Sequence, residues 1–504
     1  MGRKVLVAKS GRAACPNAAA GGGIAAKRAK DAKSFLTGLT GFTGLREASV
    51  KPDKTKPSGV EWIGDIPEGW EVRRLKYVAS CNDDSLAEDT PSNFSFDYVD
   101  VGSVKYGLGI VQREPMVFAD APSRARRVVR KDDVIVSTVR TYLKSVAQIP
   151  SFNKPIIVST GFAVLRAKNS DVIFLNYALQ SQSFVDEVEA RSTGISYPAI
   201  NASDLVSIKI LLPPLPEQRV ITDYLDEKCG AIDAAVAEAK KGIEEYKAWK
   251  KSLIFEVVTG KRRVGFFNAE SQSRRVAEKM KSSGIPWIGD VPEGWVVCKT
   301  LHSLCMPITD GPHTTPELFD DGIPFVSAEA VSCGNGSIDF NHARGFISEA
   351  FYNECCRKYI PQRDDIYMIK SGATTGRVAI VDTDRIFTIW SPLAVFRCNL
   401  KRAKPRYVFY YLQSSAYQGQ VELAWSFGTQ QNIGMRALEE LKMVLPPLAE
   451  QRAIADYLDE KCSAIDAMVA EKEALIADLE AYKKSLIYEV VTGKREVAST
   501  IEMK

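Results

Sequence analysis

The sequence predicts an α+β protein in which two mixed α/β domains are separated by two long helices that form an antiparallel coiled coil. Three observations predict this fold class. One long motif occurs twice, a heptad pattern follows each copy, and a run of short β-like segments precedes each copy. Because repeated segments indicate repeated structural units, we interpret the chain as an internal duplication whose halves are related by a pseudo-twofold axis.

The duplication is clearest in the stretches "LPPLPEQRVITDYLDEKCGAID" and "LPPLAEQRAIADYLDEKCSAID". Residues 212–261 and 445–494 are identical at 35 of 50 positions without a gap. A second pair lies upstream: "GVEWIGDIPEGW" at 59–70 and "GIPWIGDVPEGW" at 284–295 share 9 of 12 residues. The regions between the two motifs differ in length and barely resemble each other. Alike ends around unlike centres indicate a common scaffold that presents two different surfaces.

Each copy of the long motif predicts a long helix. "LPP" ends the preceding strand because proline cannot donate to a β-ladder. The helices begin near Glu217 and Glu450, where acidic residues suit the helix dipole. They end at "VVTGK", where Gly260 and Gly493 are natural residues to follow a helix. About 43 residues at 1.5 Å each make a rod of roughly 65 Å.

A heptad seam runs along both predicted helices, with spacings that alternate between four and three residues, which is typical of a coiled coil. In antiparallel pairing the two seams bury each other and the variable domains lie at opposite ends of a spacer. The alternative is that each stripe packs on its own globular domain. The residues predicted to pair are Ile232, Val236, Ile243, Tyr246 and Leu253 in the first helix, and Ile465, Val469, Ile476, Leu479 and Leu486 in the second.

These features divide the chain into seven parts. We expect a disordered basic tail at 1–51, a first variable domain at 52–212, a repeated spacer helix at 213–261 and a linker at 262–283. A second variable domain at 284–445, a second repeated spacer helix at 446–494 and a C-terminal tail at 495–504 complete the chain. The tail at 1–51 is interpreted as disordered or as an over-long translation start, with a transit peptide or a DNA-tethering arm as the alternatives.

Polar and basic residues gather at the predicted turns of both variable domains. Arginine and lysine suit phosphates and guanine, glutamine and asparagine can pair with adenine, and serine and threonine fit either. A solvated face is the alternative for the basic run at 124–131, and turns are polar in any case. The candidate DNA-binding residues of the first domain are Arg124, Arg126, Arg127, Arg140, Tyr142, Lys144, Ser192, Thr193, Tyr197 and Asn201. Those of the second are His313, Thr314, Thr315, Lys370, Thr374, Thr375, Arg377, Thr429, Gln430, Gln431 and Asn432.

The composition excludes several classes. With 45% apolar and 25% charged residues the chain is typical of a soluble globular protein, and its net charge of +4 neither requires nor excludes a nucleic-acid partner. Ten scattered cysteines without a C-x-x-C pair, and only three histidines, predict no metal site and a reduced, cytoplasmic setting. The sequence contains no run of 18 apolar residues, so we predict no membrane span.

Catalytic motifs are missing as well. The sequence has no phosphate-binding G-x-x-x-x-G-K-[ST] loop and no nucleophile–base–acid set, and "LPPL" lacks the polar and aromatic residues of an amino-methyltransferase motif. We therefore predict no catalytic residues and a chain that is not an enzyme. The tryptophans of the two short boxes, Trp62, Trp70, Trp287 and Trp295, are interpreted as packing residues.

Taken together, "WIGDxPEGW", "LPPLxEQRxIxxYLDEK" and "KKSLIxEVVTGK", each present twice, resemble the DNA-specificity subunit of type I restriction–modification systems. The resemblance covers about residues 58–494. In the second domain "DGPHTTP", "SGATTGRVAIV" and "GTQQNI" match the usual family pattern. The first domain departs from it, because "STVRTYLKS" and "STGISYPAIN" replace the last two loops, which implies a different half-site.

The resemblance implies that each variable domain is a target-recognition domain reading one half of a split double-stranded DNA site, while the helices set the gap between the halves. It implies two methyltransferase subunits and two translocase–endonuclease subunits as partners. S-adenosylmethionine, ATP and Mg²⁺ would belong to those partners, and no cofactor to this chain. A modification-only complex would carry the same kind of chain. The competing hypothesis is a coiled-coil scaffold that binds proteins without reading DNA.

Overall fold

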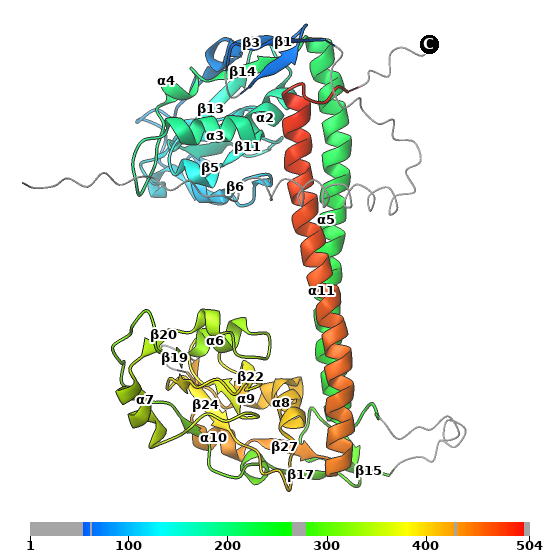
Figure 1. The fold of residues 1–504 in the computed structure, drawn as a ribbon. Helices are drawn as coiled ribbons and strands as arrows, with labels where there is room; N and C mark the ends of the chain where they lie inside the picture. The colour runs from blue at the N-terminus through cyan, green and yellow to red at the C-terminus, as the bar shows by residue number, and fades with distance from the viewer. Residues whose placement is uncertain (1–53, 61–62, 265–278, 428–430, 498–504) are drawn as a thin grey trace, which may run out of the picture. The chain divides into compact units, whose positions relative to one another are not determined.

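The computed structural model describes residues 54–60, 63–264, 279–427 and 431–497, which form two compact units (Figure 1). Unit 1 comprises residues 1–240 and 473–504, and unit 2 comprises residues 241–472. Two 44-residue helices, α5 (Leu215–Val258) and α11 (Leu448–Val491), contribute one part to each unit. Within the described part of the chain, every helix is too short or too polar to cross a bilayer.

Unit 1 contains two four-stranded sheets with helices packed beside them. In one sheet β12 pairs parallel with β5 and antiparallel with β9, so the sheet is mixed. The first sheet has the order β11 (Val146–Gln148), β10 (Val134–Ser137), β13 (Phe162–Ala167), β4 (Ala79–Cys81). The second has the order β8 (Glu114–Val117), β5 (Ser95–Val99), β12 (Ile156–Ser159), β9 (Ala125–Val128). Small pairs are β1 (Thr55–Pro57) with β2 (Asp65–Pro67), β3 (Glu71–Arg74) with β14 (Lys209–Leu212), and β6 (Val104–Lys105) with β7 (Gly109–Ile110). The helices are α2 (Val172–Gln180), α3 (Gln182–Arg191) and α4 (Ala202–Leu205).

Unit 2 repeats this plan with different lengths. Its second sheet is also mixed, because β19 pairs parallel with β23 and antiparallel with β20. The first sheet has the order β18 (Thr309–Asp310), β24 (Leu393–Phe396), β21 (Ile366–Ile369), β22 (Val378–Ile380). The second has the order β20 (Gly345–Ile347), β19 (Ile323–Val326), β23 (Thr388–Ile389). Small pairs are β15 (Met280–Ser282) with β16 (Asp290–Pro292), β17 (Val296–Lys299) with β27 (Lys442–Leu445), and β25 (Ser426–Phe427) with β26 (Gln431–Asn432). The helices are α6 (Ala328–Cys333), α7 (Glu349–Cys356), α8 (Pro405–Gln413), α9 (Ser415–Leu423) and α10 (Met435–Glu440). The predicted mixed α/β content of both variable regions is therefore confirmed.

The Glu-Gln pair of each long motif attaches the long helix to its unit. In unit 1 the Glu217 carboxylate accepts a hydrogen bond of 2.8 Å from the Trp70 indole. The buried Gln218 side chain donates to the Pro213 carbonyl and accepts from the backbone N–H of Asp171, the residue before α2. In unit 2 the same bonds recur: Trp295 donates to Glu450, and Gln451 links Pro446 to Lys404, the residue before α8. The Glu-Gln pair of the helix motif therefore also connects the long helix to the rest of its unit.

The box tryptophans differ in their burial. Trp70 and Trp295 are buried, as expected for packing residues. Trp287 is 41% exposed, and its indole donates to the Ala416 carbonyl at 3.1 Å. Trp62 lies outside the described residues.

In unit 1 the first part of α5 packs against the last part of α11. The buried Ile232, Val236, Leu479 and Leu486 belong to one apolar cluster, with Ile476 half-buried at its edge. Asp233 accepts from Lys483, and Lys240 lies 3.7 Å from Glu480. Residue numbers rise along one segment as they fall along the other, so the two segments run in opposite directions in this unit.

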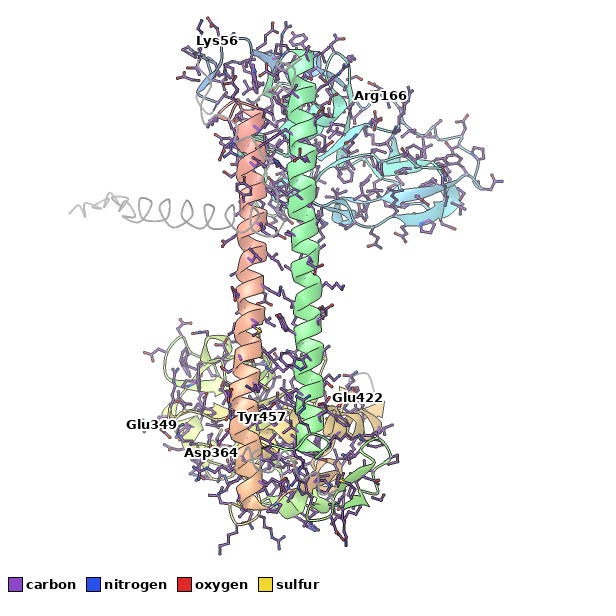
Figure 2. The ribbon with its side chains drawn as sticks, turned by 90° about the vertical axis from the view of Figure 1, so that its right-hand side faces the viewer. Lys56, Arg166, Glu349, Asp364, Glu422 and Tyr457 are labelled. Atoms are coloured by element: carbon purple, nitrogen blue, oxygen red, sulfur yellow. The ribbon has the colours of Figure 1, made fainter. Side chains whose placement is uncertain are left out.

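In unit 2 the last part of α5 packs against the first part of α11, where Tyr457 is labelled in Figure 2. Leu253 and Ile465 are buried in its largest apolar cluster, with Tyr246 half-buried against it. The Lys250 ammonium lies 2.7 Å from the Asp466 carboxylate. Of the other predicted seam positions, Ile243 is buried and Val469 is half-buried.

Each long helix is followed, two residues after its last residue, by a glycine with a left-handed backbone. Gly260 has φ +75° and Gly493 has φ +67°. The N–H of Arg262 returns to the carbonyl of Glu256, and that of Arg495 to Glu489, which satisfies carbonyls that the last turn leaves open. The turn also brings each glycine against a box proline, because a Cβ on Gly493 would lie 2.4 Å from Pro67 Cδ.

Candidate nucleic-acid interface

Two predicted polar segments of unit 1, 138–144 and 192–201, form one surface. The segment 138–144 leaves strand β10, and the Ile200 N–H donates to the Thr138 carbonyl at 2.9 Å. Val139 and Ala199 form a β-bridge. The buried Thr141 hydroxyl lies 2.8 Å from the Ser192 hydroxyl. These bonds hold together two loops that are about fifty residues apart in the chain.

Large side chains stand out from this surface. Tyr142 and Tyr197 are 50% and 68% exposed, and Ile195 is fully exposed. The Arg140 guanidinium lies 5.5 Å from the centre of the Tyr197 ring. Arg140 has φ +52°, a left-handed conformation that is uncommon for a side chain other than glycine and that often marks functional sites. Thr193 and Asn201 are also exposed.

Lys144, the second cation predicted in these loops, is held by acids of α3. Its ammonium lies 3.2 Å from both the Asp186 and Glu189 carboxylates. Burial opposes the charged form, but the bonds to Asp186 and Glu189 prevail and raise the pKa of Lys144. These bonds fasten the loop to α3, and they reduce the attraction that Lys144 offers a phosphate.

The basic run at 124–131 includes strand β9, and most of its charges are compensated. Arg124 lies 3.3 Å from Asp100, and Arg130 lies 2.9 Å from Asp84. The Arg126 guanidinium stacks 4.9 Å from the centre of the Phe118 ring. Arg127 is half-buried within the strand. The carbonyl of Arg124 accepts from the Thr160 N–H, and Gly161 is bonded to Thr138, so this run shares a turn with the loop surface.

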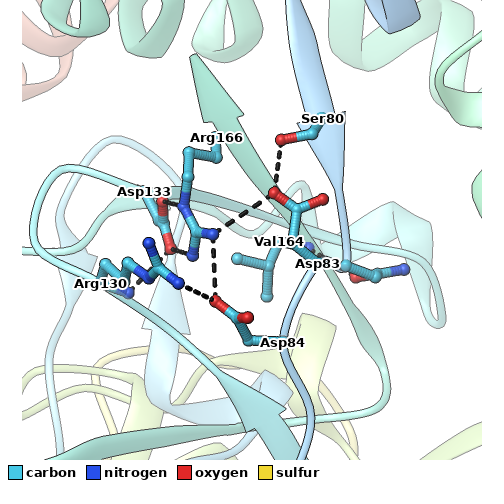
Figure 3. Close-up of polar contacts among 8 residues, drawn as sticks. Ser80, Asp83, Asp84, Arg130, Asp133, Val164 and Arg166 are labelled. Atoms are coloured by element: carbon cyan, nitrogen blue, oxygen red, sulfur yellow. Dashed lines mark hydrogen bonds and ion pairs between the residues drawn. The ribbon is translucent and has the colours of Figure 1, made fainter. Parts of the chain in front are cut away.

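An arginine–carboxylate network supports the strand that leads into the first loop (Figure 3). Arg166 on β13 binds the buried Asp133 through two bonds of 2.9 and 2.8 Å. The same guanidinium reaches Asp84 at 3.0 Å and Asp83 at 3.3 Å. The hydrogen bonds that Arg166 donates to Asp133 raise the pKa of Arg166, and the bond that it donates to Asp84 lowers the pKa of Asp84. Asp133 directly precedes β10, so the network fixes the start of the strand whose end carries Arg140.

Unit 2 has a corresponding support. Arg397 binds the buried Asp365 through two bonds of 2.7 Å, and Asp365 directly precedes β21. The Tyr359 hydroxyl donates to the same carboxylate, and burial raises the pKa of that hydroxyl. Strand β21 leads into the segment 370–377, so each unit presents its loop from a strand held by one buried ion pair.

Three predicted segments of unit 2 converge. The Gly372 N–H donates to the Gln431 carbonyl at 3.0 Å, and Ser371 forms a β-bridge with Asn432. The buried Asp310 carboxylate lies 3.3 Å from the Lys370 ammonium and 3.2 Å from His313 Nε2. His313, Thr314, Thr315, Gln431 and Asn432 are exposed at this place. Thr429 and Gln430 lie outside the described residues.

A polar pocket of about 400 Å³ lies beside Arg377 in unit 2. Arg377 is exposed and donates to the Ser332 carbonyl at 2.9 Å. Thr374 and Thr375 are half-buried, and the Thr375 hydroxyl donates to the Gly372 carbonyl. Gln418 donates to the Gly376 carbonyl, where the glycine has φ +91° and leaves no room for a Cβ.

Sequence reasoning missed several residues of both surfaces. Lys358, which follows α7, binds Asp310 at 2.5 Å and so joins the unit 2 site. Gln418 and Asn335 line the pocket beside Arg377. In unit 1 the exposed Ile195 carries no polar signal, although its position between Gly194 and Tyr197 in a turn was a usable hint.

The two surfaces suit recognition. They offer guanidinium groups, hydroxyls, amides and aromatic faces, which are the groups that contact phosphates and base edges. Among the residues that the structure describes, no group of three or more histidine, cysteine, aspartate or glutamate side chains is arranged to hold a metal ion.

A duplicated α+β fold whose two units present different polar loops is the arrangement expected of a recognition protein. The chain belongs to the type I restriction–modification DNA specificity family, because the model of the type I restriction modification DNA specificity domain matches residues 67–234 and 312–476. The resemblance drawn from the repeated motifs is thereby confirmed, and with it the role of a DNA-specificity protein.

Individual relatives agree with this assignment. A putative type I restriction enzyme MjaX specificity subunit of Methanocaldococcus jannaschii is 25% identical over 455 residues, covering 86% of this chain and 96% of the relative. The EcoBI specificity subunit of Escherichia coli is 19% identical and covers 62% of this chain and 63% of its own length. A chain from a solved type I R-M system has the same fold, with a TM-score of 0.62, 23% identity, and coverage of 84% of this chain and 98% of that chain.

Proposed function

We propose that this chain reads a two-part double-stranded DNA site and directs the adenine methylation or ATP-dependent cleavage that partner subunits carry out. One observation carries the proposal: two units of the same plan present loops at the same strand ends, but with different side chains. The loop after β10 offers Arg140 and Tyr142, and the loop after β21 offers Arg377 beside the half-buried Thr374 and Thr375. A repeated frame with unlike loops suits two different half-sites.

The chain acts in this proposal by recognition, and chemistry belongs to its partners. Two methyltransferase subunits and two translocase–endonuclease subunits would supply S-adenosylmethionine, ATP and Mg²⁺ sites. The relatives that carry the name of type I restriction enzyme specificity subunit support an assembly of this kind.

The long helices are proposed to form an antiparallel coiled coil related by a pseudo-twofold axis, acting as a spacer between the half-sites. The pairing of Asp233 with Lys483 and of Lys250 with Asp466 supports this, because the two pairs occupy equivalent positions in the repeat. A stiff spacer would make the separation of half-sites a geometric quantity.

The test is a methylation map of host DNA by long-read sequencing, made with the wild-type chain and with Arg140→Ala and Arg377→Ala. We expect a two-part methylated motif in which each variant relaxes one half only. Losing a good base contact costs about 1–3 kcal/mol of discrimination at its position. Arg363→Ala is the matched control, since Arg363 is exposed but already bound to Asp384 at 2.8 and 3.0 Å.

The competing scaffold hypothesis makes the opposite prediction. A protein-binding scaffold would leave the methylated motif unchanged in both variants. Gel shifts of the complex with its methyltransferase subunit at rising salt add a second readout, because phosphate contacts make DNA affinity fall steeply with salt concentration. Both variants relaxing the same half would contradict the assignment of one half-site to each unit.

A further inference from the structure

The segments that follow the two long helices differ at a single position. Residues 257–264 read "VVTGKRRV" and residues 490–497 read "VVTGKREV". The difference places Arg263 in unit 2 where Glu496 stands in unit 1. Because the surrounding box and helix residues are repeated, the surroundings of Arg263 and Glu496 can be compared residue by residue.

In unit 2 the arginine completes a small site. The Arg263 guanidinium lies 2.8 Å from Glu450 Oε1 and 5.6 Å from the centre of the Trp295 ring. The Trp295 indole donates to the other carboxylate oxygen, Glu450 Oε2, at 3.0 Å. Glu450 is only 6% exposed. A buried carboxylate is costly without a partner, and here a guanidinium and an indole N–H share it.

In unit 1 the equivalent carboxylate meets a second acid. The Trp70 indole donates to Glu217 Oε1 at 2.8 Å, as in unit 2. Glu496 lines the same cavity, which has a volume of about 250 Å³ and is also bounded by Pro67 and Ile221. Burial and the charge of Glu496 together raise the pKa of Glu217, although the Trp70 bond opposes this. The cavity far exceeds the roughly 30 Å³ share of one water molecule.

The cations nearby do not replace the missing arginine. Arg495 lines the cavity, but its guanidinium lies 2.8 Å from Glu489. Lys54 also lines the cavity. Its counterpart in unit 2, Lys279, makes the same backbone bond to the box and coexists there with Arg263. A lysine therefore precedes the box in both units, and in unit 2 it occurs in addition to Arg263.

We infer that the cavity between Trp70, Glu217 and Glu496 is a binding site for an arginine side chain that comes from outside the described residues. The guanidinium would lie against the Trp70 ring and bridge the two carboxylates, as Arg263 lies against Trp295 and Glu450. Two carboxylates and an aromatic face select a guanidinium over neutral groups. The arginine has two possible sources: residues 1–53 of this chain, which contain ten lysines and arginines, or another polypeptide.

The probe is N-acetyl-arginine methylamide, titrated calorimetrically into the full chain, with the citrulline analogue as its uncharged counterpart. We expect the arginine amide to bind at least tenfold more tightly than the citrulline amide. Glu496→Arg copies unit 2 into unit 1, so it should weaken binding of the probe at least tenfold and raise Tm by about 2–4 °C. The control is Glu68→Arg, which makes the same change of charge at an exposed acid that does not line the cavity.

A second variant of this chain identifies the source of the arginine. In this full-length variant the ten lysines and arginines of residues 1–53 are replaced by glutamine. Tighter binding of the probe than in the wild type assigns the arginine to this chain, and equal binding assigns it to another polypeptide. The inference is overturned if neither protein binds the arginine amide, if citrulline binds equally well, or if Glu496→Arg behaves like Glu68→Arg.

Discussion

Single charged residues have two different tasks in this protein, and their partners distinguish the tasks. Asp133 and Asp365 are buried and each binds an arginine through two bonds, so they hold strands in place. Arg140 and Arg377 are exposed in the loops that follow those strands. In the sequence all four are charged residues near predicted turns. Only their burial in the structure distinguishes the two that hold strands from the two that are exposed.

The support task leads to a prediction for Arg166. Arg166→Met would leave the buried Asp133 carboxylate without its guanidinium, and we expect a loss on the order of 2–3 kcal/mol of unfolding free energy, allowing for the partial exposure of Arg166. Urea unfolding of the full chain measures it. Arg73→Met removes an exposed ion pair with Glu71 and should cost less than about 0.5 kcal/mol. Equal losses in the two variants would contradict a supporting role.

Among elements, the long helices were predicted most accurately, because their signals are local and periodic. Both begin two residues before the predicted Glu217 and Glu450. The reason in the first copy is that Pro216 fits the first turn, where its missing N–H would have no helical partner. The dual role of the Glu-Gln pair was not predicted, because the bonds to Trp70 and to the start of α2 join segments far apart in the chain.

The helix seam carries one lysine–aspartate pair in each unit, which makes its register testable. Lys250→Asp places an acid beside Asp466 and should destabilise the pair, while the double variant with Asp466→Lys restores opposite charges. We expect a coupling free energy of about 1 kcal/mol in a double-mutant cycle followed by thermal unfolding. The same cycle is made with Lys483 and Asp233, the equivalent pair in the other unit. Strictly additive effects at both pairs would show that the bonds do not specify register.

At the scale of the whole molecule, the proposed spacer predicts how the DNA motif depends on helix length. Deleting residues 237–243 and 473–479 removes one heptad from each helix and preserves the seam. The helices shorten by about 10 Å, so the gap between the half-sites should shrink by about three base pairs at 3.4 Å each. Methylation mapping measures the gap. The control replaces the same fourteen residues by two other heptads, one in each helix, so that the helix lengths stay the same. An unchanged gap after the deletion would overturn the proposal that the helices set the gap.

The duplication, the long helices and the mixed α/β regions could be predicted from repeats and periodicities, because these patterns are visible in the sequence without knowledge of the chain path. The contacts between loops could not be predicted in this way. Gly372 meets Gln431, Thr141 meets Ser192, and Arg124 is neutralised by Asp100, because bonds between distant residues depend on where the folded chain places them. For the same reason one changed letter, Arg263 to Glu496, becomes informative only when the folded units show what surrounds each residue.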